Sequence, residues 1–134
     1  MSDHATGTFD VQLHAAPPDT YADGATMGRM TVDKQLHGDL DATSIGQMLT
    51  GGEISTGSGV YVAVEKVTGS LKGLTGSFIL HHTGIMDKGA QHLTITVVPG
   101  SGTGQLAGLT GSMTIDIKDG KHFYGFDYAI VGKL

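Results

Sequence analysis

The sequence contains no cysteine and no tryptophan, three prolines, and eight lysine and arginine residues that are scattered singly. Without cysteine there are no disulfides, thiolate metal ligands or cysteine nucleophiles. Nucleic acid and an anionic membrane surface are disfavoured as partners, because both require clustered cations and the net charge here is −5. The sequence also lacks an apolar window of membrane-span length.

The first residues show no basic region followed by an apolar run, so we expect a cytoplasmic, soluble protein. A chain of 134 residues is long enough to bury a real core, and we expect one domain over residues 1–134. Glycine occurs 22 times without a matching excess of proline. This composition indicates many tight corners rather than disorder.

Alternation of polar and apolar residues dominates the chain, and no helical stripe competes with it. We expect strands at about residues 8–14, 29–37, 40–49, 60–67, 77–83, 93–98, 112–117 and 122–131. Residues 19–28 are expected to form a loop, and the glycine-rich segment 50–59 a mobile flap. The apolar run 60–67 is typical of a strand buried on both faces. Eight strands with short connections favour an all-β fold with little helix, an eight-stranded antiparallel β-barrel, over a sandwich.

A ten-residue pattern, T-G-x-L-x-G-L-T-G-S, occurs at residues 68–77 and again at 103–112. Each copy joins two predicted strands, so we expect the same corner twice, with a single helical turn whose leucines cap one end of the barrel. The glycines at 100–104 superficially resemble a phosphate-binding loop. The Gly-Lys-Ser/Thr ending of such a loop is missing, and the repeated pattern indicates architecture.

Four segments resemble the bacterial DUF family numbered 3224 in order and over roughly residues 7–128: GRMTVDKQ from Gly28, GVYVAVE from Gly59, VVPGSGTGQLAGL from Val97 and DGKHFYGFDY from Asp119. The resemblance implies an allene oxide cyclase-like β-barrel, akin to plant dirigent proteins, and a small homo-oligomer, a dimer or trimer. The family carries no established reaction. Its fold relatives cyclise or steer reactive small molecules, but a fold does not confer a function.

The chain departs from the family pattern at three positions. Lys66 stands where arginine is usual, His81 where glutamine is usual, and Gly125 where an acidic residue is usual. The last difference matters most, because any chemistry that depended on this acid would be absent here.

Strand alternation places several polar residues on the same faces as apolar ones. If these faces point inward, Glu65 and His82 share an apolar cavity and are the candidate catalytic residues for proton transfer or cation stabilisation. The ligand-binding candidates are Met30, Lys34, Tyr61, Phe78, Tyr124 and Tyr128.

Structural roles compete with these assignments. Glu65 pairing with Lys34 would make a satisfied interior bridge, and Glu65 pointing outward would leave Lys66 inside. A core histidine bonded to a backbone carbonyl is an alternative for His82, and buried tyrosines commonly serve packing.

Metal and cofactor binding are not expected. The seven histidines show neither HxH nor HExxH spacing, and the adjacent His81 and His82 point to opposite faces of a strand. A G-x-S-x-G nucleophile elbow is also missing, so the sequence does not support a hydrolase triad.

These features predict a barrel that binds a small apolar or amphipathic organic molecule in its lumen. The enzyme version is a cofactor-independent isomerase or cyclase whose mouth is gated by residues 50–59. The alternatives are a non-catalytic carrier or sensor resembling a lipocalin, and a solidly packed oligomeric barrel with a structural role. Cavity volume discriminates between a ligand-binding and a packed interior.

Overall fold

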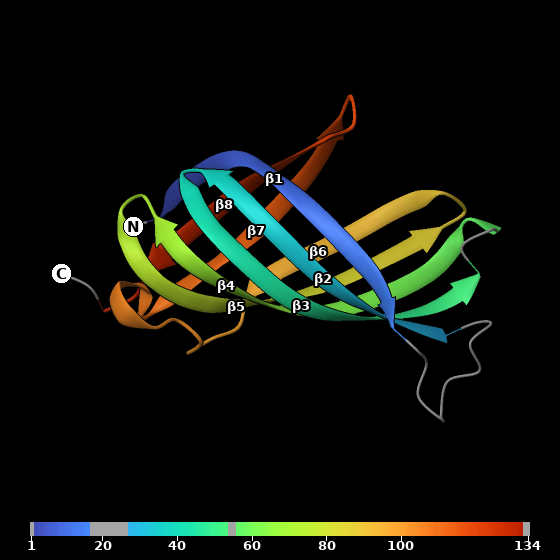
Figure 1. Cartoon of the computed structure of the whole chain (residues 1–134), viewed down its shortest axis with the longest axis horizontal. Helices are drawn as coiled ribbons and strands as arrows, with labels where there is room; N and C mark the ends of the chain where they lie inside the picture. Colours follow the sequence, from blue (N-terminus) through green and yellow to red (C-terminus); the bar gives the residue numbers. More distant parts are fainter. Residues whose placement is uncertain (1, 17–26, 54–55, 133–134) are drawn as a thin grey trace.

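A computed structural model describes residues 2–16, 27–53 and 56–132. The chain forms a closed antiparallel barrel in which each strand pairs with the next and β1 pairs with β8, as the sequence predicted (Figure 1). The strands are β1 (Asp3–Ala16), β2 (Met27–Gly38), β3 (Leu40–Glu53), β4 (Ser58–Leu71), β5 (Leu74–Asp87), β6 (Ala90–Val97), β7 (Leu109–Lys118) and β8 (Lys121–Ile130), and a 3₁₀ turn, η2 (Gly104–Leu106), precedes β7. None of the described segments is a helix long and apolar enough to span a membrane.

Two-residue turns join three of the hairpins, and their conformation follows from local sequence. In each turn a non-glycine residue with positive φ precedes a glycine with positive φ, which is the type I′ geometry that suits the twist of a hairpin. The turns, with their φ angles, are Lys72-Gly73 (47° and 87°), Lys88-Gly89 (51° and 87°) and Asp119-Gly120 (51° and 76°). The predicted Asp119-Gly120 hairpin is confirmed.

Two of the expected connections differ from the structure. Residues 50–53 of the predicted flap at 50–59 continue β3, and residues 58 and 59 begin β4 directly opposite them, whereas 54 and 55 lie outside the described residues. The strand residues belong to a paired ladder, and mobility of the segment stays a prediction. Of the loop predicted at 19–28, residues 27 and 28 begin β2, and the remainder lies outside the described residues.

The repeated ten-residue pattern adopts two different structures. The second copy contains the expected helical turn, η2, whereas the first copy turns within two residues between β4 and β5. The first copy is held by a continuous hairpin on both sides, which leaves no residues for a helical turn. The two copies contact each other, since Thr103 N donates to Ser77 O at 2.8 Å and Thr75 N donates to Gln105 Oε1 at 2.9 Å.

The outer face of β4 is exposed, which corrects the prediction that this strand is buried on both sides. Val60, Val62 and Val64 are 44%, 45% and 58% exposed, and Ile45 of β3 and Ile85 of β5 are exposed beside them. A subunit interface would cover such a face, and the expected dimer or trimer stays a prediction.

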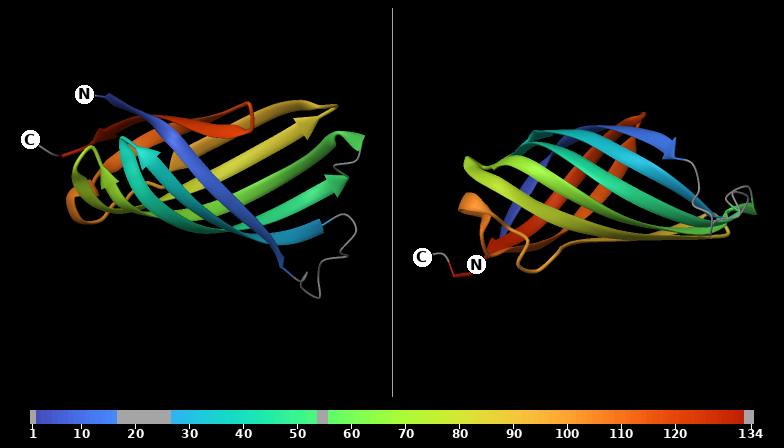
Figure 2. Two further views of the ribbon diagram at one scale, coloured as in Figure 1. Left: turned by 45° about the horizontal axis from the view of Figure 1, so that its top comes forward. Right: turned by 60° about the horizontal axis from the view of Figure 1, so that its bottom comes forward.

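The two ends of the barrel differ in closure. The strands β6 and β7 pair at two positions, Ile95 with Met113 and Thr96 with Ser112, and β1 pairs with β8 no further than Phe9. Beyond these points the tip of the β7–β8 hairpin stands away from β6, as Figure 1 and the right-hand view of Figure 2 show. The end that carries both chain termini is therefore a closed barrel, and the opposite end is a mouth walled by β1 to β6.

Candidate functional site

A buried ionic cluster lies between the packed end and the mouth. Its centre is Glu65 on β4, whose Oε1 accepts hydrogen bonds from Lys34 Nζ at 3.2 Å and from His82 Nε2 at 2.7 Å. Its other oxygen, Oε2, accepts the hydroxyl hydrogen of Ser44 at 2.5 Å. The side chains of Lys34, Glu65 and His82 are 8%, 3% and 6% exposed. Lys34 Nζ also lies 5.0 Å from the ring centroid of Phe9. Each charge of the cluster therefore has a partner, as a buried ion pair requires.

The cluster keeps Glu65 ionised. Burial by itself raises the pKa of this carboxyl, but the hydrogen bond from His82, the positive charge of Lys34 and the hydrogen bond from Ser44 together lower the pKa to about 2. The interior orientation of Glu65 resolves the alternative that Lys66 points inward, because Lys66 is exposed. The satisfied bridge to Lys34 is present, as the structural alternative predicted.

Tyr61 connects this cluster to the mouth. Its hydroxyl oxygen lies 3.5 Å from His82 Nδ1, at the long end of hydrogen bonding, and the two rings are 6.3 Å apart. Burial, and secondarily the charge of Glu65, raises the pKa of Tyr61. Gly84 makes room for the ring, since a Cβ at this position would lie 2.2 Å from Tyr61 Cε1. The tyrosine therefore presents a protonated hydroxyl whose position depends on a neighbouring glycine.

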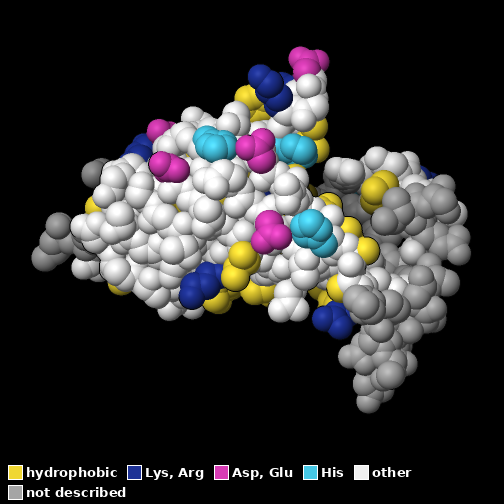
Figure 3. All heavy atoms as spheres, in the orientation of Figure 1, with side chains coloured by type: hydrophobic (Ala, Val, Ile, Leu, Met, Phe, Trp, Pro, Cys, Tyr) yellow, Lys and Arg dark blue, Asp and Glu magenta, His cyan; other side chains and the backbone are white. Residues whose placement is uncertain are grey.

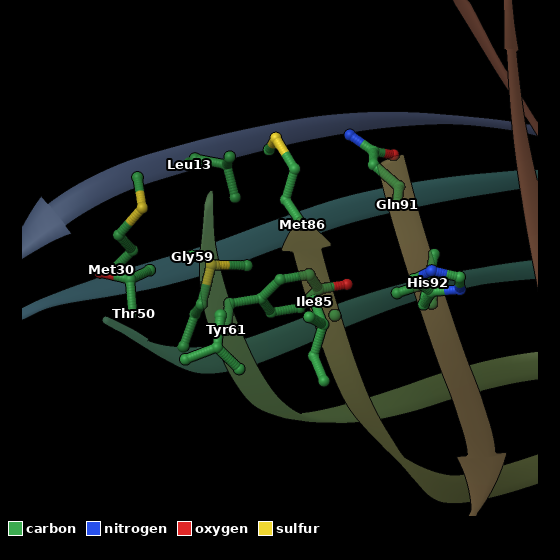
Figure 4. A pocket seen from close by; sticks show the side chains of 13 residues that line it. Leu13, Met30, Thr50, Gly59, Tyr61, Ile85, Met86, Gln91 and His92 are labelled. Atoms are coloured by element: carbon green, nitrogen blue, oxygen red, sulfur yellow. The ribbon is translucent and has the colours of Figure 1, made fainter. Parts of the chain in front are cut away.

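Above Tyr61 the mouth encloses a cavity of about 330 Å³. All of its described lining residues belong to β1–β6: Leu13, Met30, Met48, Thr50, Gly59, Val60, Tyr61, Gly84, Ile85, Met86, Gln91, His92 and Leu93. Figure 4 shows the side chains of Met30, Leu13 and Met86 above the ring of Tyr61, with Gln91 on the neighbouring strand. Methionine side chains adapt to ligands of varied shape, so this is an apolar, adaptable pocket with a phenol in its wall.

The predicted site residues all face the interior, but they occupy three different levels of it. Met30 and Tyr61 line the mouth cavity. Lys34, Glu65 and His82 form the ionic cluster beneath it. The remaining candidates lie in the packed end: Phe78, Tyr124 and Tyr128. The eight candidates are therefore distributed along the interior, and their roles in catalysis and ligand binding stay predictions.

The three aromatic candidates at the packed end make structural contacts. Phe126 stacks between Phe78 and Tyr128, with ring centroids 5.8 Å and 5.3 Å away. The hydroxyl of Tyr124 accepts from Leu40 N at 2.9 Å and donates to His37 O at 2.8 Å, so it holds the β2–β3 turn. Burial raises the pKa of Tyr124. These contacts favour packing roles, and ligand binding by the three side chains stays a prediction.

Sequence reasoning missed Ser44, Met48 and Gly84. Ser44 and Met48 alternate with Leu40 and Ala42 on β3, so strand parity was a usable signal for both. Gly84 left no such signal, because its role depends on the position of the Tyr61 ring across the β4–β5 ladder, where the two residues are directly opposite.

Most of the histidines lie on the surface of the barrel. His81 points outward and bonds Thr96, whereas His82 points inward, which confirms that they face opposite sides of β5. Three exposed histidines pair with aspartates over β1, β2 and β8, and Figure 3 shows histidine and acidic side chains next to one another on this face. The pairs are His4–Asp127 at 2.6 Å, His37–Asp10 at 3.1 Å and His14–Asp33 at 3.7 Å. Pairs this exposed contribute little to stability.

Comparison with known proteins agrees with the fold. A family profile described as a protein of unknown function (DUF3224) matches residues 5–128. A crystal structure of a protein with unknown function from the DUF3224 family of Shewanella oneidensis MR-1 is 43% identical, with a TM-score of 0.90, and the match covers 97% of this chain and 98% of that chain. Among curated proteins there is no match. Neither description names an activity, so a function has to be inferred from the geometry of the mouth.

Proposed function

The chain belongs to the DUF3224 family, and we propose that it binds a small, largely apolar organic molecule in the mouth cavity. The observation that carries this proposal is the cavity of about 330 Å³ between Met30, Tyr61 and Met86. Ligand sites are typically concave, mostly apolar and roughly 300–1,000 Å³ in volume, with a few placed polar groups. A carrier, a sensor and an enzyme would all share this binding step.

Naphthalene is a suitable first probe, because it is apolar and small enough for the cavity. We expect equilibrium dialysis to detect saturable binding to the protein. Met86→Trp places a large ring in the cavity and takes up space that the ligand needs. Binding should weaken at least about tenfold, which corresponds to about 1.4 kcal/mol. Ile45→Trp is the matched control, because Ile45 is 66% exposed on the outer face. Equal binding by the two variants, or no saturable binding to the parent protein, would contradict the proposal.

A second candidate function is that of a cofactor-independent isomerase. The observation that favours it is the series Tyr61, His82 and Glu65, joined by contacts of 3.5 Å and 2.7 Å. Tyr61 Oη would accept a proton from the ligand as its own hydrogen passes to His82 Nδ1, and the carboxylate of Glu65 would stabilise the resulting imidazolium. The expected likeness to allene oxide cyclase barrels supports the same class of reaction by analogy of fold alone.

The isomerase candidate is tested with 3-cyclohexen-1-one. A base removes a proton from the carbon between the carbonyl and the double bond, the double bond moves into conjugation, and a proton returns to the far carbon. The conjugated product is followed by its ultraviolet absorbance. Support requires turnover by the parent protein that is lost in Glu65→Gln while naphthalene binding is retained. Full activity in Glu65→Gln, or no turnover by the parent protein, would reject it and leave the binding proposal intact.

A further inference from the structure

The ionic cluster determines which nitrogen of His82 carries a hydrogen. Glu65 Oε1 lies 2.7 Å from His82 Nε2 and belongs to an ionised carboxylate, which can only accept. Nε2 must therefore carry hydrogen. Lys34 already balances the charge of Glu65, so a neutral His82 leaves the cluster as an ion pair with no excess charge. In this tautomer Nδ1 is an unprotonated acceptor.

The tautomer in turn orients Tyr61. The phenol has one hydrogen, and the acceptor beside it is His82 Nδ1 at 3.5 Å. When this hydrogen points at Nδ1, the lone pairs of the phenol oxygen are what remains for a molecule in the cavity. Tyr61 then acts towards the ligand as an acceptor, although a tyrosine is often assumed to donate.

The other polar side chains of the cavity do not change the role of Tyr61 as a hydrogen-bond acceptor. Gln91 and His92 are exposed at the rim, away from Tyr61, and the hydroxyl of Thr50 rotates to suit either kind of partner. At the position beside Tyr61, a ligand group that can only accept would face the phenol oxygen without a hydrogen between them. Leaving such a group buried without a partner is unfavourable.

We infer that the ligand is an apolar alcohol or phenol, whose hydroxyl donates to Tyr61 Oη. A carboxylate or an ether offers only acceptors to this position. A cationic amine would lose its hydration in an apolar cavity whose described lining residues include no carboxylate to pair with it. This inference rests on the proposed binding function, because it names the chemical class that the mouth cavity takes.

Three probes of similar shape test the inference by equilibrium dialysis at pH 8: 2-naphthol, which donates, 2-methoxynaphthalene, which only accepts, and naphthalene. Tyr61→Phe removes the hydroxyl and keeps the ring. We expect this variant to bind 2-naphthol about tenfold more weakly, the value of one hydrogen bond with a desolvated partner, and to bind the other two probes within about twofold of the parent protein. Using one variant against three probes cancels their differences in hydrophobicity.

The inference is overturned if Tyr61→Phe weakens 2-methoxynaphthalene as much as 2-naphthol, or changes neither. If none of the probes binds the parent protein, the binding function itself fails instead. A second measurement does not depend on a variant that folds. Long-range ¹H–¹⁵N correlation spectra of the labelled protein at pH 8 should show His82 with hydrogen on Nε2 and a bare Nδ1. The opposite tautomer would overturn the inference directly.

Discussion

The end of the barrel that carries the chain termini is filled by stacked rings and leucines, whereas the mouth at the other end holds methionines around a cavity. Both ends are built from the same long strands β1–β5. The difference comes from β7 and β8, which supply Met113 and Phe126 to the packed end and no described lining residue to the cavity. The cavity arises here because two of the eight strands, β7 and β8, turn away before the mouth. The ionic cluster around Glu65 lies at the boundary, with packing on one side and the cavity on the other.

The largest expected effect is at this boundary. Glu65→Ala leaves Lys34 buried without its partner, and removal of one member of a buried pair typically costs about 3–5 kcal/mol. Urea unfolding followed by circular dichroism measures the loss. The control is the double variant Lys34→Met with Glu65→Leu, which removes both charges and should recover part of the stability, since only the acceptor of His82 and Ser44 is still lost. A double variant as unstable as the single one would show that the pair itself, rather than the orphaned charge, is what matters.

Loss of packing at the closed end should lower the free energy of unfolding nearly as much. Phe126 is fully buried between two stacked rings, and truncating a buried phenylalanine to alanine costs about 3–5 kcal/mol. The matched change at the mouth is Met86→Ala, where the side chain is half-buried at the cavity. We expect less than about 1 kcal/mol there, because the lost side chain has few packed neighbours to leave behind. Comparable losses at the two positions would mean that the mouth is packed like the closed end.

Acid should lower the free energy of unfolding over a defined pH range, because Glu65 at the boundary becomes protonated. The pKa of Glu65 is lowered from 4.5 to about 2 by folding, so its contribution is fully present above pH 4.5 and is lost as the pH falls towards 2. By linkage this contribution is about 3 kcal/mol. The measurement is the free energy of unfolding between pH 6 and pH 2, compared with the Lys34→Met, Glu65→Leu double variant. The double variant should lose less stability over the same range, and parallel curves would rule out Glu65 as the source.

A smaller effect is expected where the closed end is held by hydrogen bonds. Tyr124→Phe leaves the ring in place but deprives the buried backbone N–H of Leu40 of its acceptor. An unsatisfied buried donor costs about 1–3 kcal/mol. Thermal unfolding measures the change, with Tyr61→Phe as the control, since the hydroxyl of Tyr61 contacts the His82 side chain and, among the described residues, bonds no backbone group. A Tyr124→Phe protein as stable as the parent would show that water replaces the hydroxyl.

The strands were predictable from sequence because their signals are local. Alternation grouped Glu65 and His82 with apolar residues of their strands, and the structure shows that these faces point inward. Asp119-Gly120 marked its own turn. The repeated pattern was less informative, because its copies at 68–77 and 103–112, which share eight of ten residues, form a two-residue hairpin turn and a 3₁₀ turn. Whether an inward residue lies in the packed end or at the mouth was not predictable. The boundary between the two depends on where β6 and β7 stop pairing, which is a property of the assembled sheet.

The seam between β1 and β8 also bears on how the chain folds during synthesis. It pairs residues near the start of the chain with residues near its end, for example Ala5 with Phe126. The ribosome therefore releases β1 long before its second neighbour exists, and the earlier hairpins must wait as an open sheet with two unpaired edges. Closure over such a separation in sequence is slow relative to hairpin formation, and exposed edges invite pairing with other chains. Synthesis of β8, rather than formation of the first hairpins, is the step that ends this exposure.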